Sequence, residues 1–189
     1  MDIKILNSSD YIMTSWSGGT TTQLYIDPIE TQFKNNDYNF RLSIATVEIE
    51  ESIFTKLPGV SRTLMVLDGE ITLTHDGHHQ KDLKKFDSDR FSGDWTTKCL
   101  GTCRDFNLMT RGRTLGTLTP ITFEGSKSVK LNSSNQLTFF YLNKGMATVQ
   151  IDKEHQLNQN ELIVIQEAPE SEITICSNRL TEIIRIDIK

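Results

Sequence analysis

Short runs of β-forming residues, several with apolar and polar side chains in alternation, recur along this chain and constrain its fold most. They occupy residues 40–45, 71–74, 139–142, 162–165 and 183–188. Because successive side chains on a β-strand point to opposite faces, each run predicts a strand. Turn-forming pairs such as Asp-Gly separate the runs, and a helical turn is expected only near residues 87–91. The sequence therefore predicts an all-β fold with little helix, namely a sandwich, a jelly roll or a small barrel.

A weak internal repeat suggests that this β architecture is duplicated. Residues 66–73 and 142–149 both read as a strand, a tight turn at a glycine (Gly69 or Gly145) and a second strand. Two similar β-hairpins could also arise by chance. If the repeat is a duplication, we expect two similar barrels or sandwiches joined face to face. Glycine and proline interrupt the pattern near residues 112–120, so we place one domain at residues 1–113 and the other at 114–189.

Charge and targeting signals narrow the classes of partner. The formal net charge is −5 and no stretch is rich in Lys or Arg. Nucleic acid and anionic membrane surfaces are therefore not expected as partners. The first residues do not resemble a secretory signal, and no apolar run approaches the roughly 20 residues that span a bilayer. The three cysteines, Cys99, Cys103 and Cys176, fit small core residues better than a disulfide framework. We expect a cytoplasmic protein with reduced thiols.

The strand expected over residues 104–113 carries an unusual polar face. Asp105, Asn107, Met109 and Arg111 share this face, and the residues between them form an apolar one. If the polar face points into a barrel, water, a ligand or mutual hydrogen bonds must satisfy it. Such a row fits a ligand cavity, and the alternative is a strand face in contact with solvent.

Two further arginines are candidates for the same cavity. The strand over residues 40–47 puts Arg41 and Ser43 on one face and apolar residues on the other. Arg62 opens a strand after the turn at residues 57–60, which could aim its guanidinium. The planar fork of an arginine suits a carboxylate.

A glycine- and threonine-rich segment near the start offers parts of an anion site. Trp16 is followed by Gly18 and Gly19, then by Thr20, Thr21, Thr22 and Gln23. Exposed N–H groups and hydroxyls can form an anion nest, although no lysine follows the glycines as in a P-loop. The alternative is a flexible turn that leads into a Thr-rich strand.

The histidines do not predict a metal site. His75, His78 and His79 flank an Asp-Gly dipeptide, which is a strong hairpin signal, so we expect them at an exposed hairpin tip. His75 and His79 could approach each other, but the sequence offers no evident third ligand. His155 stands apart, and no Ser-His-Asp arrangement can be assembled.

Several blocks in chain order resemble the HutD/Ves family of small bacterial proteins. The blocks are Trp16 with residues 18–21, residues 40–45, residues 57–62 with 67–69, residues 91–94 and residues 105–111. The second half is similar only in length and β pattern. Gln23 departs from the Glu expected there and would keep a hydrogen bond but lose a charge, and Leu57 replaces a frequent aromatic residue.

The resemblance implies a double cupin-like barrel without the histidine-rich metal signature of enzymatic cupins, and hence no metal or other cofactor. For the histidine-utilisation branch it implies a regulator of histidine degradation that binds a pathway intermediate such as N-formylglutamate. The Ves branch is instead linked to stress and cold response.

Three hypotheses remain open on the sequence alone. The first is a protein that binds a small anionic, carboxylate-bearing metabolite through Arg41, Arg62 and Arg111, with Ser43 and Asn107 orienting it. In this hypothesis Asp105 holds an arginine, and Trp16 and Met109 supply apolar contacts. The second is a metal-independent isomerase or hydrolase with Asp105 as general base. The third is an interaction module without a pocket, and strand edges would also allow a homodimer. The candidate ligand-binding residues are Trp16, Gly19, Thr20, Thr21, Gln23, Arg41, Ser43, Arg62, Asp105, Asn107, Met109 and Arg111.

Overall fold

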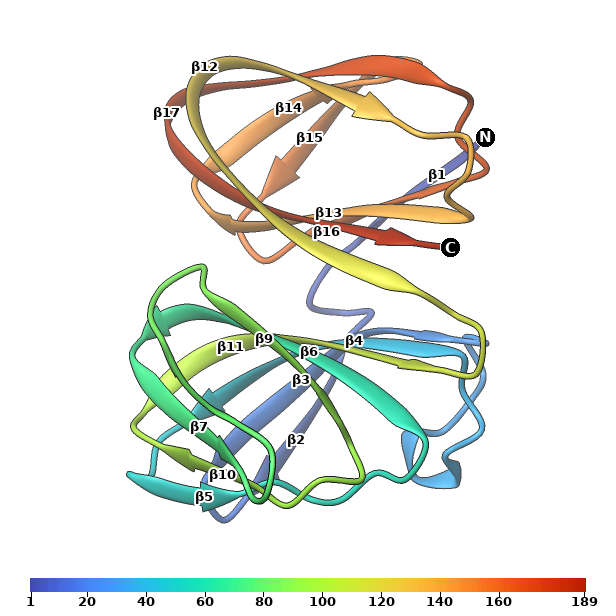
Figure 1. The fold of residues 1–189 in the computed structure, drawn as a ribbon. Helices are drawn as coiled ribbons and strands as arrows, with labels where there is room; N and C mark the ends of the chain where they lie inside the picture. The colour runs from blue at the N-terminus through green and yellow to red at the C-terminus, as the bar shows by residue number, and fades with distance from the viewer. The chain divides into compact units, whose positions relative to one another are not determined.

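The computed structural model describes residues 1–189 and is almost entirely β. It contains 17 strands and one short 3-10 helix, η1 (Phe33–Asn35). The chain divides into two compact units, Tyr11–Leu115 and Met1–Asp10 together with Gly116–Lys189 (Figure 1). The predicted all-β fold class with little helix is confirmed. None of the helical segments has the length or the apolar character that crossing a bilayer requires.

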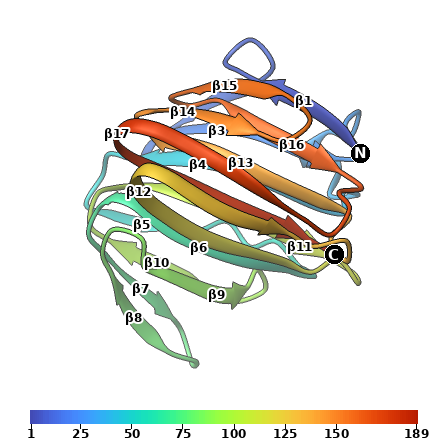
Figure 2. The same cartoon turned by 90° about the horizontal axis from the view of Figure 1, so that it is seen from above.

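The unit Tyr11–Leu115 contains two antiparallel sheets. The larger sheet has the strand order β2-β3-β4-β11-β6-β9, and the smaller has the order β5-β10-β7-β8. Figure 2 shows β10, β7 and β8 of the smaller sheet side by side. The bounds of these strands are β2 (Ile12–Trp16), β3 (Gly19–Asp27), β4 (Phe40–Val47), β5 (Glu51–Ile53), β6 (Val60–Gly69), β7 (Ile71–His75), β8 (Gln80–Leu83), β9 (Ser88–Ser92), β10 (Thr97–Leu100) and β11 (Cys103–Arg111).

Apolar residues from both sheets form a shared core cluster in this unit. Leu64 and Val66 of β6 pack in the same buried cluster as Ile71 and Leu73 of β7. The two sheets therefore pack against each other through the inward face of alternating strands. The remaining members of the cluster are Val47, Leu83, Phe91, Cys99 and Cys103, which agrees with the predicted core role of the first two cysteines.

The second unit is built on two long strands, β12 (Gly116–Leu131) and β17 (Ser171–Ile188), which pair along nearly their whole length. β17 also pairs with β13 (Leu137–Lys144) and with β14 (Met146–Gln150). The sheet is completed by β1 (Asp2–Leu6), β15 (Glu154–Asn158) and β16 (Leu162–Gln166). Its core includes Phe140, Leu142, Ile163, Ile175 and Ile183, all fully buried.

The repeat expected from the sequence is present as a repeated order of strand pairing. In one unit β6 pairs with β9 and β7 pairs with β8; in the other β13 pairs with β16 and β14 pairs with β15. The two glycine turns are also alike, because Gly69 has a φ of 86° and Gly145 a φ of 100°. Residues with a Cβ rarely adopt this conformation, so both copies need glycine at the same point.

Two local expectations differ from the structure. We expected residues 1–10 in one domain with residues 11–113. They belong instead to the unit that contains Gly116–Lys189, because β1 pairs with β16 over five residues. No sequence pattern reveals which distant strand will accept an edge strand. The helical turn expected at residues 87–91 is wrong, since β9 runs through it and pairs with β6.

Candidate functional site

A cavity of about 280 Å³ lies within the unit Tyr11–Leu115. Its wall comes from the larger sheet, from β5 and the segment that follows it, and from Phe33 of η1. Eight residues predicted for a ligand site line this cavity: Trp16, Thr21, Arg41, Ser43, Arg62, Asp105, Asn107 and Met109. If the protein were an interaction module without a pocket, the polar face of residues 105–111 would be exposed to solvent. Asp105, Asn107 and Met109 are instead buried.

Strand register brings the two key arginines together. Met109 of β11 pairs with Arg41 of β4 on one side and with Arg62 of β6 on the other. Directly opposed residues on neighbouring strands point to the same face, and strands lie about 4.8 Å apart. The Cα atoms of the two arginines are therefore about 10 Å apart, and long side chains from these positions can reach a common ligand. Asn107 and Ser43 form the next paired row.

The guanidinium of Arg62 is buried and incompletely hydrogen-bonded. Its Nη2 donates to Asn107 Oδ1 at 3.3 Å, whereas its Nε is buried and has no acceptor. The group lies 4.7 Å from the ring centre of Phe54 and 5.2 Å from that of Phe91. Burial lowers the pKa of Arg62 to about 10, against the opposing effects of Asp105 and Tyr38. Arg62 thus stays charged at neutral pH, with one donor still to be satisfied.

Arg41 is held by neutral partners. Its Nε donates to Gln23 Oε1 at 2.8 Å and its Nη1 to Ser43 Oγ at 3.2 Å, while Phe33 lies 4.1 Å below the guanidinium. Burial lowers the pKa of Arg41 to about 10, and the nearby positive charge of Arg62 acts in the same direction. Gln23 does not line the cavity, so it acts as a positioning residue for Arg41.

Asp105 is linked to Arg62 through Asn107. The Asn107 side-chain amide donates to Asp105 Oδ1, and Cys103 Sγ donates to Asp105 Oδ2 at 3.4 Å. Because Asn107 uses its nitrogen for Asp105, its oxygen is left to accept from Arg62. Burial raises the pKa of Asp105 to about 6, although the neighbouring hydrogen bonds and Arg62 oppose this rise. Asp105 was expected to hold an arginine in place. In the structure it is linked to Arg62 through the side-chain amide of Asn107.

Besides Gln23, three predicted site residues lie outside the cavity wall. Arg111 is the last residue of β11, where its Nη1 donates to the Asn36 carbonyl oxygen and its guanidinium lies 5.8 Å from the Tyr38 ring. Thr20 pairs with Thr46 in the sheet. At Gly19 a Cβ would lie 1.9 Å from Thr46 O, so this glycine permits close strand approach. Gly19 and the threonines that follow it thus belong to β3, and among them only Thr21 reaches the cavity.

Comparison with known proteins shows the family of this chain. The sequence model of the HutD family matches residues 8–180. The chain belongs to the HutD family. None of the curated proteins matches the sequence.

Solved structures agree with the membership in the HutD family. A conserved protein of unknown function from Pseudomonas aeruginosa PAO1 gives a TM-score of 0.86 at 21% identity, with 100% of each chain covered. HutD from Pseudomonas fluorescens SBW25 gives 0.78 at 22% identity, over 100% of this chain and 98% of that one. A cupin 2 conserved barrel domain protein from Leptotrichia buccalis gives 0.58 at 12% identity, over 100% and 98%. The fold is cupin-like.

Two of the three aromatic residues of the cavity, Phe33 and Phe54, were not predicted from the sequence of this HutD-family chain. Phe33 and Phe54 lie against the guanidinium groups of Arg41 and Arg62. Neither belongs to an alternating run, because Phe33 lies in η1 and Phe54 follows the end of β5. Strand periodicity carries no information about such positions. The other cavity residues that were not predicted are Thr14, Ala45, Val47, Ser52, Ile53, Thr55 and Leu57.

The histidine prediction for this HutD-family chain was wrong at one position. His78 and His79 are exposed near the expected hairpin turn, but His75 is 2% exposed. Its Nε2 lies 3.0 Å from Asp89 Oδ2, and its Nδ1 lies 2.8 Å from Thr97 Oγ1. His75 ends β7, where the inward face of the strand continues up to the turn.

Proposed function

We propose that this HutD-family protein binds a small carboxylate-bearing metabolite in the cavity of the unit Tyr11–Leu115. The observation that carries the proposal is the pair of buried guanidinium groups of Arg41 and Arg62 on one cavity wall. Neither forms an ion pair with a carboxylate, and Arg62 Nε has no acceptor.

Two buried positive charges that form no direct ion pair are unfavourable by themselves, and Asp105 is the only carboxylate that lines the cavity with them. Removing a charge from water costs several kcal/mol unless an opposite charge or good hydrogen bonds compensate it. The partners of Arg41 are a neutral amide and a hydroxyl, and the partner of Arg62 is a neutral amide. An anionic ligand would supply the missing charge, and a carboxylate matches the planar donors of arginine.

The volume and the lining residues of the cavity favour a small metabolite as the ligand. Its volume of about 280 Å³ is near the lower end of the range for small-molecule pockets, which is roughly 300–1,000 Å³. Trp16, Phe33, Phe54 and Met109 offer apolar contacts beside the arginines. N-formylglutamate, which has carboxylates and a short apolar stem, fits this chemistry. The structure of HutD from P. fluorescens SBW25 represents a formate condition, and formate is the simplest carboxylate.

The biological role that we propose is regulation of histidine utilisation by ligand binding. Membership in the HutD family supports this proposal, and the geometry of the cavity does not bear on it. We also propose that the two units are tandem cupin-like barrels, because the strand pairing of β6–β9 has its counterpart in β13–β16.

Calorimetry with N-formylglutamate, glutamate and formate tests the binding proposal. A charge-assisted hydrogen bond contributes about 1.5–3 kcal/mol, so Arg41→Ala and Arg62→Ala should each weaken binding about 10- to 150-fold. Arg113→Ala is the matched control, because Arg113 is exposed in the same unit and outside the cavity. If no carboxylate binds the unaltered protein, or if Arg41→Ala binds as well as Arg113→Ala, the proposal fails.

Asp105 supports a second candidate function, a metal-independent isomerase or hydrolase. It lines the cavity, and burial raises its pKa to about 6, within the range useful for a general base at neutral pH. Turnover of a bound metabolite by the unaltered protein, and its loss in Asp105→Asn with binding retained, would favour the enzyme. Binding without turnover favours the receptor.

A further inference from the structure

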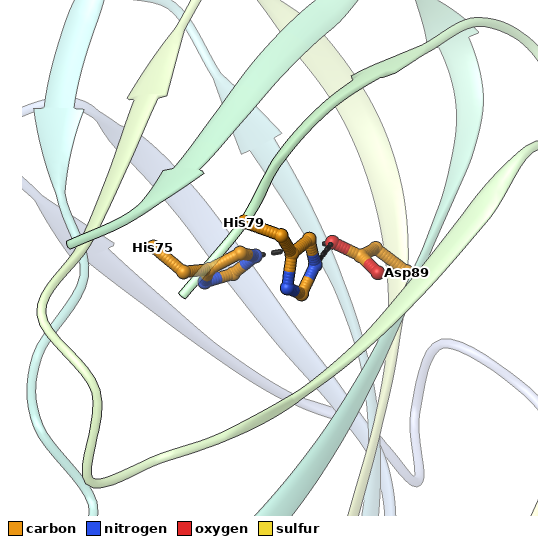
Figure 3. Close-up of side chains that lie close together, drawn as sticks. All are labelled: His75, His79 and Asp89. Atoms are coloured by element: carbon orange, nitrogen blue, oxygen red, sulfur yellow. Dashed lines mark hydrogen bonds and ion pairs between the residues drawn. The ribbon is translucent and has the colours of Figure 1, made fainter. Parts of the chain in front are cut away.

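Three potential metal ligands meet where β7 and β8 of the smaller sheet approach β9 of the larger sheet. His75 ends β7, His79 directly precedes β8, and Asp89 lies in β9. Figure 3 shows both imidazoles directed at the carboxylate of Asp89. His75 Nε2 lies 3.0 Å and His79 Nε2 lies 2.9 Å from the same oxygen, Asp89 Oδ2. The three donor atoms all lie within 4.8 Å of one another.

We propose that His75, His79 and Asp89 bind a divalent transition-metal ion such as zinc. None of the three lines the cavity, so this site is separate from the proposed carboxylate site. Two imidazoles and one carboxylate form a common ligand set for zinc and related ions, with a further position left for water.

The spacing of the donors is close to what such an ion needs. Zinc binds imidazole nitrogen and carboxylate oxygen at about 2.0–2.2 Å, so tetrahedral ligands lie about 3.3–3.5 Å apart. The two nitrogen–oxygen distances of 3.0 and 2.9 Å are shorter by only about half an ångström. Small side-chain rotations would therefore open the cluster around an ion. The His79 side chain is 40% exposed, which gives the ion and a water ligand access from solvent.

Neighbouring groups already orient two of the three ligands. Thr97 Oγ1 lies 2.8 Å from His75 Nδ1, so the other ring nitrogen is the one presented to Asp89. The backbone N–H of Arg90 donates to Asp89 Oδ1 at 2.9 Å and leaves Oδ2 for the histidines. Hydrogen bonds of this kind fix ring orientation around bound metals. The nearby ammonium of Lys81 donates to the Ser88 carbonyl oxygen instead of to Asp89.

The adjacent histidine serves as an internal control. His78 stacks on Trp95 with ring centres 3.7 Å apart, and its ring makes no hydrogen bond to Asp89. The proposal therefore predicts that only two of the three clustered histidines contribute to metal affinity. A site formed by loose surface histidines would lose affinity equally at His78 and His79.

Titration of the full chain with zinc chloride by calorimetry, and with Co²⁺ by visible absorption, tests the site. We expect one ion per chain, and at least tenfold weaker binding in His79→Gln and in Asp89→Asn. His78→Gln and His155→Gln should bind as the unaltered protein does. Co²⁺ should give d–d bands without a thiolate charge-transfer band, which excludes Cys176 as the ligand.

Two results would overturn the proposal: no saturable binding by the unaltered protein at millimolar Zn²⁺, or equal affinity in His79→Gln and His78→Gln. His79 is exposed, so its replacement should leave the fold intact, and circular dichroism checks this. Arg62→Ala should keep full metal affinity, which separates this site from the carboxylate site.

Discussion

Asp105→Asn should stabilise the protein at pH 8 and leave its stability nearly unchanged at pH 4. Burial raises the pKa of Asp105 from its ordinary value of 3.8 to about 6 in the folded protein. A raised pKa means that the folded state prefers the protonated carboxyl. Its contribution to stability is therefore fully present below about pH 4 and is lost as the pH rises through about 6. Asparagine cannot ionise, so the variant escapes this loss.

The magnitude follows from the same values. A rise of the pKa from 3.8 to about 6, at about 1.4 kcal/mol per pKa unit, corresponds to about 3 kcal/mol at pH 8. Asparagine can still accept from Asn107 through its oxygen, so at low pH the two side chains are nearly equivalent. The stability difference should thus grow from near zero at pH 4 to about 3 kcal/mol at pH 8, with most of the change between pH 4 and 6.

Urea unfolding followed by tryptophan fluorescence is the suitable assay. Both tryptophans, Trp16 and Trp95, belong to the unit Tyr11–Leu115, so the signal reports the unit that contains Asp105. Asp68→Asn is the matched control, because Asp68 is an exposed carboxylate on β6. A stability difference for Asp105→Asn that stays constant from pH 4 to pH 8, or a loss of stability at pH 8, would refute the reasoning.

Two further predictions concern the turns and the thiols. Gly69→Ala should destabilise the protein by about 1–3 kcal/mol in urea unfolding, because φ is 86° and the new Cβ would lie 2.5 Å from Thr102 O. Gly77→Ala, with a φ of 78° but open space around it, should cost less, and equal losses would mean that the close contact is unimportant. Burial raises the pKa of the Cys103 thiol, so in the native protein at pH 8 a thiol reagent should modify the partly exposed Cys176 first. A faster reaction at Cys103 than at Cys176 would contradict the buried position of the Cys103 thiol.

The polar wall of the cavity was largely predictable from the sequence. The alternating run at residues 40–47 corresponds to β4 residue for residue, and it places Arg41 and Ser43 on one face. The same rule places Asp105, Asn107 and Met109 together on β11. These predictions succeed because the direction of a side chain on a strand depends only on its position in the alternation.

The sequence by itself determined strands with clear alternation such as β4 and β11, their faces, two glycine turns and the polar residues available for a site. Only the tertiary structure decided which strands are neighbours, and hence that Arg41 and Arg62 flank Met109 across β4, β11 and β6. It also moved Arg111 to a backbone carbonyl outside the cavity and brought Asp89 to the two histidines. Alternation is a local property of the chain, whereas strand pairing depends on hydrogen bonds and burial between residues distant in sequence.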